Sequence, residues 1–185
     1  MEIQILPLRH LSQAEADRII TGYTSNERYA AARLESEAQT TLSLTLEDLP
    51  QPYHKKFDTG SETLAMYNQV LEQGFSLGAY RQEYLVALAV AEPRRWNRSL
   101  WVWEFDVDPA YRRQGLGMTL MDALSGKAKA AGLRIMVCET QNTNLPAIRF
   151  YRKAGFQIEA VDLSYYTNQD VESFEVAIFM KRRLE

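Results

Sequence analysis

A strand that ends in a glycine-containing turn and leads directly into a helix is the feature that most restricts how this chain can fold. Residues 100–107 are apolar and rich in aromatic side chains, and Gly115 and Gly117 lead into a helical pattern that ends at Gly132. Glycine lets the backbone approach a ligand closely, and the first turn of a helix offers unpaired N–H groups at the positive end of its dipole. The segment therefore predicts a phosphate-binding turn.

Three interpretations fit the two glycines. An ordinary strand–turn–helix junction needs no ligand. A dinucleotide-binding turn needs a third glycine at the position of Leu120, which makes it a poor match. The third interpretation is an Arg/Gln-x-x-Gly-x-Gly/Ala loop, which residues 112–117 (Arg-Arg-Gln-Gly-Leu-Gly) satisfy without a gap. This pattern resembles the pyrophosphate loop of the GNAT superfamily of N-acetyltransferases.

A second segment supports the resemblance. Residues 144–156 read Asn-x-x-Ala-x-x-Phe-Tyr-x-x-x-Gly-Phe. A helix cap at Asn144, a core position for Phe150 and a left-handed helix end at Gly155 would explain this pattern without any function. The pattern also resembles the segment that follows strand 5 in GNAT enzymes, and it comes after the glycine loop in the expected order. Streptothricin acetyltransferases in particular are similar at residues 96–98, 133–141, 161–166 and 174–179, with a looser similarity at residues 52–57.

The order of the predicted elements indicates an α+β fold, which the resemblance identifies as the GNAT fold. We expect a mixed, largely antiparallel sheet of about six to seven strands with a β-α-β crossover that carries the pyrophosphate loop. Ser12 and Ser61 are the expected N-caps of two helices, and Leu42, Leu44 and Leu46 are expected to face inward. The expected strands are 3–8, 41–46, 75–80, 84–91, 100–107, 135–138, 156–164 and 174–181. The expected helices are 12–20, 25–38, 61–73, 116–131 and 144–154.

The composition of the chain limits which classes of function it can have. The net charge of -3 gives no reason to expect nucleic acid as a partner. The single cysteine, Cys138, excludes an internal disulfide and is expected to be a buried strand residue. The longest apolar run, 85–91, is too short to cross a bilayer, and the scattered histidines make a metal site unexpected. We expect one cytoplasmic N-acetyltransferase domain over residues 1–185, with the resemblance concentrated in 75–181, no membrane association, and a homodimer as an option.

The resemblance implies direct transfer of an acetyl group from acetyl-CoA, as co-substrate, to a primary amine. Backbone N–H groups of the glycine loop would hold the pyrophosphate, and a backbone N–H of the strand over residues 105–107 would polarise the thioester carbonyl. The implied cofactor-binding residues are Phe105, Asp106, Val107, Arg112, Arg113, Gln114, Gly115, Leu116, Gly117, Met118, Asn144 and Tyr151.

Two residues are the candidate catalysts. The Tyr151 phenol stays protonated at neutral pH and could protonate the leaving thiolate, or its ring could merely pack on the pantetheine arm. Glu104 is the candidate base for the amine, acting directly or through water, and strand alternation puts Asp106 on the same face. Asp106, Glu139 and Glu175 are alternative bases, and the last two could instead attract a cationic substrate.

The leading function is therefore N-acetylation of a small cationic molecule, for instance a streptothricin-like antibiotic. Streptothricin acetyltransferases tend to carry adjacent acids in strand 4, whereas Phe105 separates Glu104 from Asp106 here. The amine is left open for that reason. The alternatives are a protein acetyltransferase that acts on an N-terminal or lysine amine, and a non-catalytic sensor that binds acyl-CoA.

Overall fold

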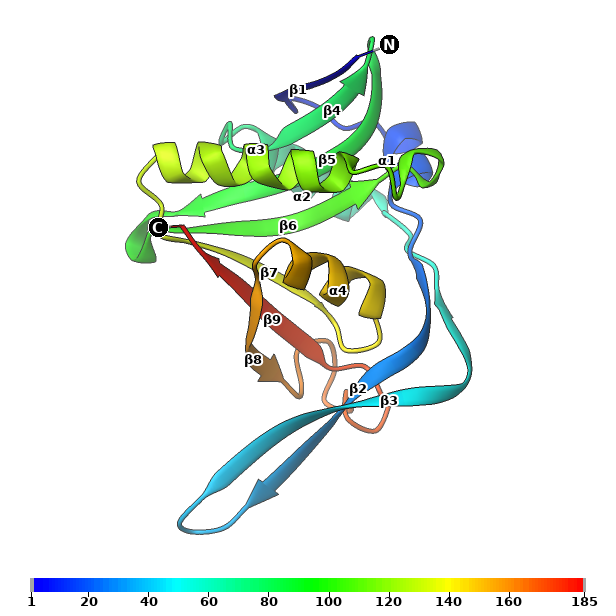
Figure 1. The fold of residues 1–185 in the computed structure, drawn as a ribbon, viewed down its shortest axis with the longest axis vertical. Coiled ribbons are helices and arrows are strands. Elements are labelled where there is room, and N and C mark those ends of the chain that lie inside the picture. Colours follow the sequence, from blue (N-terminus) through cyan, green and yellow to red (C-terminus); the bar gives the residue numbers. More distant parts are fainter. Residues whose placement is uncertain (1, 185) are drawn as a thin grey trace. The chain divides into compact units, whose positions relative to one another are not determined.

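The computed structural model describes residues 2–184, and the chain divides into two compact units. The first unit contains Met1–Thr21, Lys56–Cys138 and Arg182–Glu185, and the second contains Gly22–Lys55 and Glu139–Lys181. The described residues contain four α-helices and a seven-stranded sheet with the strand order β1-β4-β5-β6-β7-β9-β8, while β2 and β3 form a separate ribbon (Figure 1). This is the predicted α+β class. That residues 1–185 act as one domain stays a prediction.

The first unit holds most of the sheet. It consists of β1 (Ile3–Pro7), α1 (Gln13–Ile19), α2 (Ser61–Leu71), β4 (Leu77–Arg81), β5 (Tyr84–Arg94), β6 (Ser99–Val107), α3 (Leu116–Ala130) and the first part of β7 (Ile135–Gln141), with short 3₁₀ turns at Arg95–Asn97 and Pro109–Tyr111. Strands β1, β4, β5 and β6 pair antiparallel in that order. The predicted meander and the hairpin between β4 and β5 are therefore confirmed.

The predicted crossover is also present. Strand β6 pairs parallel with β7, from Ser99 opposite Ile135 to Val102 opposite Cys138, and α3 connects the two strands. Cys138 is a free, fully buried strand cysteine, as expected. The sequence 106–120 thus folds as strand, turn and helix, which is the arrangement that a phosphate-binding turn requires.

Strand β5 forms the centre of the first unit, and every residue from Leu85 to Ala91 is buried. Leu88 and Val90 belong to the apolar cluster built with α1 and α2. Side chains alternate along a strand, so Ala87 and Ala89 point to the opposite face, where α3 packs against β4, β5 and β6 (Figure 1). The small alanine side chains let this helix lie close to the sheet.

The second unit is built from β2 (Tyr23–Glu35), β3 (Thr40–Lys55), the end of β7, α4 (Leu145–Lys153), β8 (Gln157–Asp162) and most of β9 (Ala177–Arg183). The predicted helix over residues 25–38 is wrong, because this segment is β2. Its Ala, Arg, Leu and Glu residues favour a helix, but helix propensities differ by at most about 0.7 kcal/mol for ordinary residues. An antiparallel ladder with β3, which runs from Tyr23 opposite Lys55 to Glu35 opposite Thr40, outweighs that preference.

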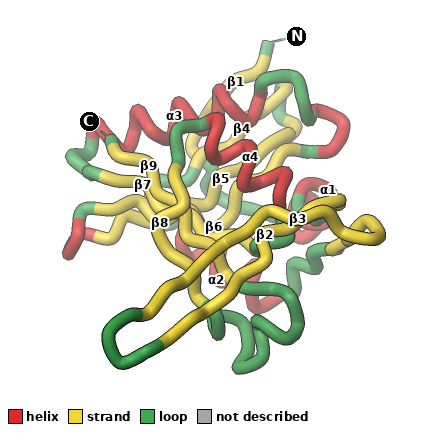
Figure 2. The backbone as a smooth tube through the Cα atoms, turned by 60° about the horizontal axis from the view of Figure 1, so that its bottom comes forward, coloured by secondary structure: helices red, strands yellow, loops and turns green. Residues whose placement is uncertain are grey.

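The predicted strand over 41–46 lies within β3, but the expectation that its leucines face inward is wrong. Leu42 is 48% exposed and Leu46 is 44% exposed, while Leu44 is half-buried. Figure 2 shows the two strands continuing as a ribbon to the loop that joins them. The alternation of apolar and polar residues correctly predicts a strand. The leucines stay exposed because a two-stranded ribbon has no second layer to cover them.

Two further positions differ from expectation in the second unit. Phe150 is half-buried, because Ile148 and Tyr151 take the buried side of α4. The last strand begins at Ala177, and residues 174–176 before it have no strand conformation.

The two predicted serine caps behave differently. Ser12 caps α1 in a full capping box, in which its side chain accepts from Glu15 N and the Glu15 carboxylate accepts from Ser12 N. Ser61 is already the first helical residue of α2, and Gly60 occupies the N-cap without a side-chain hydrogen bond. The expected cap at Ser61 is therefore wrong, since a residue inside the first turn cannot receive the N–H groups that a cap receives.

This difference predicts unequal effects of the same substitution. Ser12→Ala should lower the free energy of unfolding by about 1 kcal/mol, because it removes a side-chain cap. Ser61→Ala should change it by less than about 0.5 kcal/mol, as expected for a surface position without such a bond. Urea denaturation of both variants measures the difference, and equal losses would contradict it.

Candidate active site

A β-bulge in β6 determines where the candidate base lies. Val90 pairs with Glu104 but the next residue, Ala91, pairs with Val102, so Trp103 is the extra residue. In a regular strand, neighbours point to opposite faces, and a bulge breaks this rule locally. Trp103 packs against the apolar cluster of α1 and α2, and the next residue, Glu104, bonds to Tyr67 of α2. Both side chains therefore reach the same face of the sheet.

Glu104 is held by two donors. The Tyr67 hydroxyl donates to Glu104 Oε2 at 2.8 Å, and the Phe105 backbone N–H donates to Glu104 Oε1 at 3.1 Å. The Phe105 N–H was one of the groups predicted to polarise a thioester carbonyl. In this structure the Glu104 carboxylate accepts that N–H.

Asp106 lies on the same face of β6 as Glu104, as alternation predicted, because the two residues stand opposite Leu88 and Val90 of β5. Arg112 lies 3.4 Å from the Asp106 carboxylate. The same guanidinium donates to the Val107 carbonyl at 2.7 Å and to Thr21 Oγ1 at 3.0 Å. Arg112 is thus directed back to the end of β6, where it ties together the strand and the residues after α1.

Burial dominates the electrostatics of this carboxyl pair. It raises the pKa of Glu104, and hydrogen bonds from Tyr67 and Phe105 partly offset the effect. The pKa of Asp106 lies well above its ordinary value, because burial and then the negative charge of Glu104 disfavour its ionised form, against the opposing charge of Arg112. The pair therefore retains a proton at a pH where two isolated carboxyl groups would both be ionised.

The turn after β6 is anchored by Asp108, which is buried. Its carboxylate is paired with Arg18 of α1 and accepts the Ala110 N–H at 2.9 Å, and its own N–H donates to the Val86 carbonyl at 2.9 Å. Arg18 also donates to the Leu85 carbonyl at 2.6 Å. The sequence carries no local signal for this role of Asp108, because its ion-pair partner Arg18 lies 90 positions away.

The glycine loop has the backbone that a phosphate cradle requires. Arg113 has φ 60° and Gly115 has φ 86°, so the chain turns through the left-handed region before α3 begins. The first hydrogen bond of the helix runs from Thr119 N to Gly115 O at 3.1 Å, and no side chain caps its start. The N–H groups of residues 116–118 consequently lack helical acceptors and are directed at the loop. These groups fit a pyrophosphate.

The second motif builds helix α4 as predicted. Asn144 Oδ1 accepts the Ala147 N–H at 3.2 Å, and Gly155 ends the helix with φ 86°. Tyr151 is 7% exposed, and its ring lies 5.5 Å from that of Phe150 and 5.4 Å from that of Phe156. The cap and the helix end explain two residues of the motif structurally, and the acid role of Tyr151 stays a prediction.

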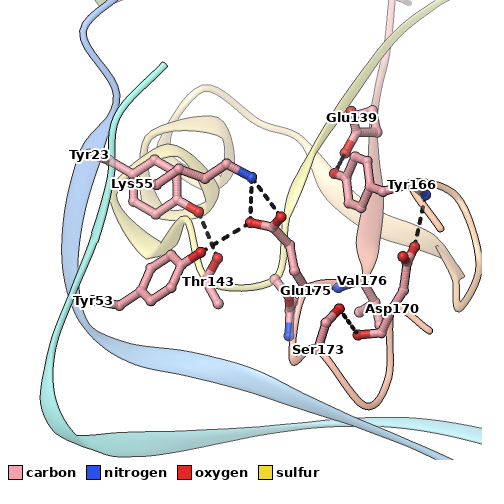
Figure 3. Close-up of polar contacts among 11 residues, drawn as sticks. Tyr23, Tyr53, Lys55, Glu139, Thr143, Tyr166, Asp170, Ser173, Glu175 and Val176 are labelled. Atoms are coloured by element: carbon pink, nitrogen blue, oxygen red, sulfur yellow. Dashed lines mark hydrogen bonds and ion pairs between the residues drawn. The ribbon is translucent and has the colours of Figure 1, made fainter. Parts of the chain in front are cut away.

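Glu175 lies at the centre of a polar cluster in the second unit (Figure 3). Both of its carboxylate oxygens lie 2.6 Å from Lys55 Nζ, and the Tyr53 hydroxyl donates to it at 3.4 Å. Tyr23 bonds to Thr143 Oγ1 at 2.6 Å, and burial raises the pKa of this phenol. Because Lys55 neutralises Glu175, this carboxylate is better suited to fix geometry than to accept a proton.

Glu139 occupies another part of the same cluster. Its carboxylate accepts the Tyr166 hydroxyl, and burial followed by the charge of Glu139 raises the pKa of that phenol. Asp170, almost fully buried, positions Tyr166 by accepting its N–H at 2.8 Å and the Thr167 N–H at 2.7 Å (Figure 3). The Lys55 ammonium lies 5.9 Å from the centre of the Tyr166 ring.

Sequence reasoning missed Asn142, which is 2% exposed. Its side chain donates to the Tyr29 carbonyl at 2.7 Å and accepts the Val176 N–H at 2.9 Å, while its backbone bonds to the same two residues at 3.0 Å. Asn142 thus joins the ribbon to the segment that carries Glu175. An isolated asparagine after a strand could equally be a turn residue, so only the structure reveals this role.

Comparison with known proteins decides the family. Residues 40–156 match the model of the acetyltransferase (GNAT) family. The chain belongs to the GNAT family. It is an acetyl-CoA-dependent acetyltransferase.

Three relatives place it within the family. Streptothricin acetyltransferase A of Bacillus subtilis (strain 168) is 29% identical over 135 residues, which are 73% of this chain and 76% of the relative. The [ribosomal protein bS18]-alanine N-acetyltransferase of Escherichia coli (strain K12) is 28% identical over 136 residues, 71% of this chain and 89% of the relative. A Bacillus anthracis protein assigned as a streptothricin acetyltransferase, solved with acetyl coenzyme A, superposes over 100% of both chains with a TM-score of 0.74 and 26% identity.

Within residues 2–184, no set of three or more His, Cys, Asp or Glu side chains is arranged to bind a metal ion. No helix in the described part has the length and apolar character needed to cross a membrane.

The Asn142 bonds predict a clear stability effect. Asn142→Ala leaves the Tyr29 carbonyl and the Val176 N–H buried without their side-chain partners, which should lower the free energy of unfolding by about 1–3 kcal/mol. Asn168→Ala, at an exposed asparagine of the same unit, is the matched control and should cost less than about 0.5 kcal/mol. Chemical denaturation compares the two, and an Asn142→Ala protein as stable as the control would refute the role of these bonds.

Proposed function

We propose that this enzyme transfers the acetyl group of acetyl-CoA directly to a primary amine of a small cationic molecule, for instance a streptothricin-like antibiotic. The observation that supports a cationic acceptor most strongly is the cluster around Glu175 and Glu139 (Figure 3). It combines two carboxylates and three tyrosines with a single lysine, Lys55. Carboxylates and aromatic faces both attract ammonium groups. The similarity to streptothricin acetyltransferase A supports the same class of acceptor.

We assign two proton transfers to named residues. Glu104 takes a proton from the ammonium, directly or through water, which frees the nitrogen lone pair to attack the thioester carbonyl carbon. The C–N bond forms, the nitrogen gives up its second proton to solvent, and the C–S bond breaks as Tyr151 gives its phenolic proton to the leaving thiolate. Solvent then restores the proton of Tyr151 and accepts the proton held by Glu104.

The cofactor itself is assigned to the first unit. The N–H groups of residues 116–118 bind the pyrophosphate, and Gly115 supplies the left-handed turn that exposes them. The carbonyl oxygen of the thioester gains negative charge as the amine attacks, and a backbone N–H of residues 105–107 is the donor assigned to it. Of these N–H groups, that of Phe105 donates to the Glu104 carboxylate in this structure. The Phe105 N–H can therefore bind the thioester oxygen only if the carboxylate releases it.

A protein amine is the second candidate acceptor. The similarity to the bS18-alanine N-acetyltransferase favours an N-terminal amine over a lysine side chain, since that relative is named for an alanine. The carboxylates of Glu139 and Glu175 would attract an N-terminal ammonium as well as a small cation. Acceptor size is therefore the property that separates the two proposals.

A panel of amines tests the proposed acceptor. Streptothricin, polyamines, aminoglycosides and peptides with a free N-terminus are each incubated with acetyl-CoA, and CoA release is measured. We expect turnover with a small cation and none with the peptides. Gly117→Glu is the control, since its carboxylate would occupy the pyrophosphate position and abolish acetyl-CoA binding in calorimetry. Turnover with peptides alone would replace the proposal by the protein-amine alternative, and no turnover with any amine would favour an acyl-CoA sensor.

Two substitutions to glutamine distinguish the residue that accepts the proton from the residue that attracts the cationic amine. Glu104→Gln removes the proton acceptor, so kcat should fall at least about tenfold and the acidic limb of the pH–rate profile should disappear. Glu175→Gln weakens an anionic recognition group, so KM for the amine should rise while kcat is maintained. Steady-state kinetics at saturating acetyl-CoA measure both, and a wild-type kcat for Glu104→Gln would exclude Glu104 as the base.

A further inference from the structure

The ammonium group of Lys55 fills a cation-binding position inside the polar cluster of the second unit (Figure 3). Its Nζ atom lies 2.6 Å from both carboxylate oxygens of Glu175 and 5.9 Å from the centre of the Tyr166 ring. The Tyr53 hydroxyl donates to the same carboxylate at 3.4 Å. Carboxylates and aromatic rings are the groups that bind ammonium ions. Lys55 therefore shows how a primary ammonium is held at this position.

The groups around this ammonium are fixed by bonds that do not involve Lys55. The backbone N–H of Glu175 donates to the Asp170 carbonyl at 2.9 Å. The Asp170 carboxylate accepts the Tyr166 N–H at 2.8 Å, and the Tyr166 hydroxyl donates to Glu139. These contacts determine where the Glu175 carboxylate and the Tyr166 ring lie. Both would therefore stay in place if the lysine ammonium moved away.

Lys55 itself is the member of the cluster that another cation can replace. It is the last residue of β3, and its ammonium stands at the end of a long, unbranched stem. The Lys55 side chain is 26% exposed and the Glu175 side chain is 22% exposed, so solvent reaches the pair. Ion pairs that solvent reaches contribute little free energy, and a released lysine side chain regains rotamer freedom. A second ammonium can therefore exchange with Lys55 at low cost.

We propose that Lys55 holds the place of a primary ammonium of the acceptor and leaves Glu175 when that ammonium binds. This inference rests on the proposed function in one respect, the binding of a cationic acceptor by this cluster. The incoming ammonium donates to both oxygens of Glu175, as Lys55 does, and lies beside the Tyr166 ring. The Lys55 ammonium moves into solvent and returns when the product leaves. No covalent bond changes in this exchange.

The two contacts with Glu175 define the chemical class that can replace Lys55. A primary ammonium carries three N–H donors and can satisfy both carboxylate oxygens. A quaternary ammonium has no N–H donor, so it offers only its charge. A neutral ligand would leave the carboxylate without a counter-ion, which is unfavourable in a partly buried site. Lys55 is thus a specificity-determining residue that admits primary ammonium groups and disfavours quaternary and neutral ligands.

Replacement of Lys55 tests the exchange by the sign of its effect. Lys55→Met removes the competing ammonium and keeps an unbranched stem. KM for the acceptor should therefore fall by about two- to fivefold, and kcat/KM should rise by the same factor. Steady-state kinetics measure both, with the amine of the panel that is turned over fastest. An unchanged or increased KM in Lys55→Met would overturn the proposal.

Lys181→Met is the matched control for this substitution. Lys181 belongs to the same unit, its side chain is 33% exposed, and its ammonium lies 3.4 Å from Glu159. The control thus removes a lysine of similar exposure that is also paired with a glutamate. Its KM should equal that of the wild-type enzyme, and a fall equal to that of Lys55→Met would overturn the proposal, because a general loss of positive charge would then explain both.

A binding measurement without turnover separates this inference from the proposed function. Nitrogen-15 NMR follows the ammonium groups of labelled lysines in the wild-type protein, and the signal missing from Lys55→Met identifies Lys55. We expect putrescine, which carries two primary ammonium groups, to shift the Lys55 signal in a saturable way. Tetramethylammonium chloride at the same ionic strength should leave that signal in place, because it cannot donate to Glu175. The Lys181 signal should respond to neither cation.

The outcomes of this measurement are distinct. A Lys55 signal that responds to neither cation, or equally to both, would overturn the exchange even if the enzyme acetylates a small cation. A selective response to putrescine in a protein that acetylates no amine of the panel would keep the cation site and reject the proposed function.

Discussion

The bulge at Trp103 is the constraint that determines where the two carboxyl groups of β6 lie. Without the extra residue, alternation along β6 would direct Glu104 toward α3, on the same face as Val102. With it, Glu104 and Asp106 lie on the face of α1 and α2, where Tyr67 meets the first and Arg112 meets the second. One inserted residue therefore places two half-buried carboxyl groups on the same face of β6, with the loss of one regular ladder position.

The same strand also fixes the cofactor turn. β6 stays paired with β5 as far as Val107, and buried Asp108 then joins the strand end to α1 through Arg18. The loop that follows can adopt left-handed conformations at Arg113 and Gly115 because its two ends are held by a strand and a helix. Strain in a loop persists only when its surroundings determine the path of the chain. The anchors of Asp108 thus support both the carboxyl pair and the N–H groups of α3.

Sequence patterns predicted the parts of the molecule whose signals are local. The glycine turn, the capped helix at Ser12 and the helix after Asn144 each depend on residues within a few positions, and all three are confirmed. The segment 25–38 failed because pairing with a distant strand overrode a moderate helix propensity. Asn142 was missed for a similar reason, since its partners, Tyr29 and Val176, lie far from it in the sequence.

For the candidate site, the sequence identified the acids but not their partners. Alternation placed Asp106 beside Glu104, yet the bulge, the Tyr67 hydroxyl and the direction of Arg112 depend on contacts across the fold. Glu175 was considered as a base for similar reasons of position. Its contact with Lys55 at 2.6 Å, absent from any local pattern, changes that interpretation. A residue type indicates which chemistry is available, whereas its partners decide which chemistry is used.

The acids of this chain illustrate that distinction. Glu175 faces a lysine, whose ammonium lies 2.6 Å from both carboxylate oxygens and balances their charge. Glu104 shares one face of β6 with Asp106, and burial raises the pKa of both carboxyl groups. The first arrangement suits the orientation of a cationic acceptor and the second suits proton transfer. Equal residue types in one enzyme can therefore serve binding and catalysis because the sign of the nearest charge differs.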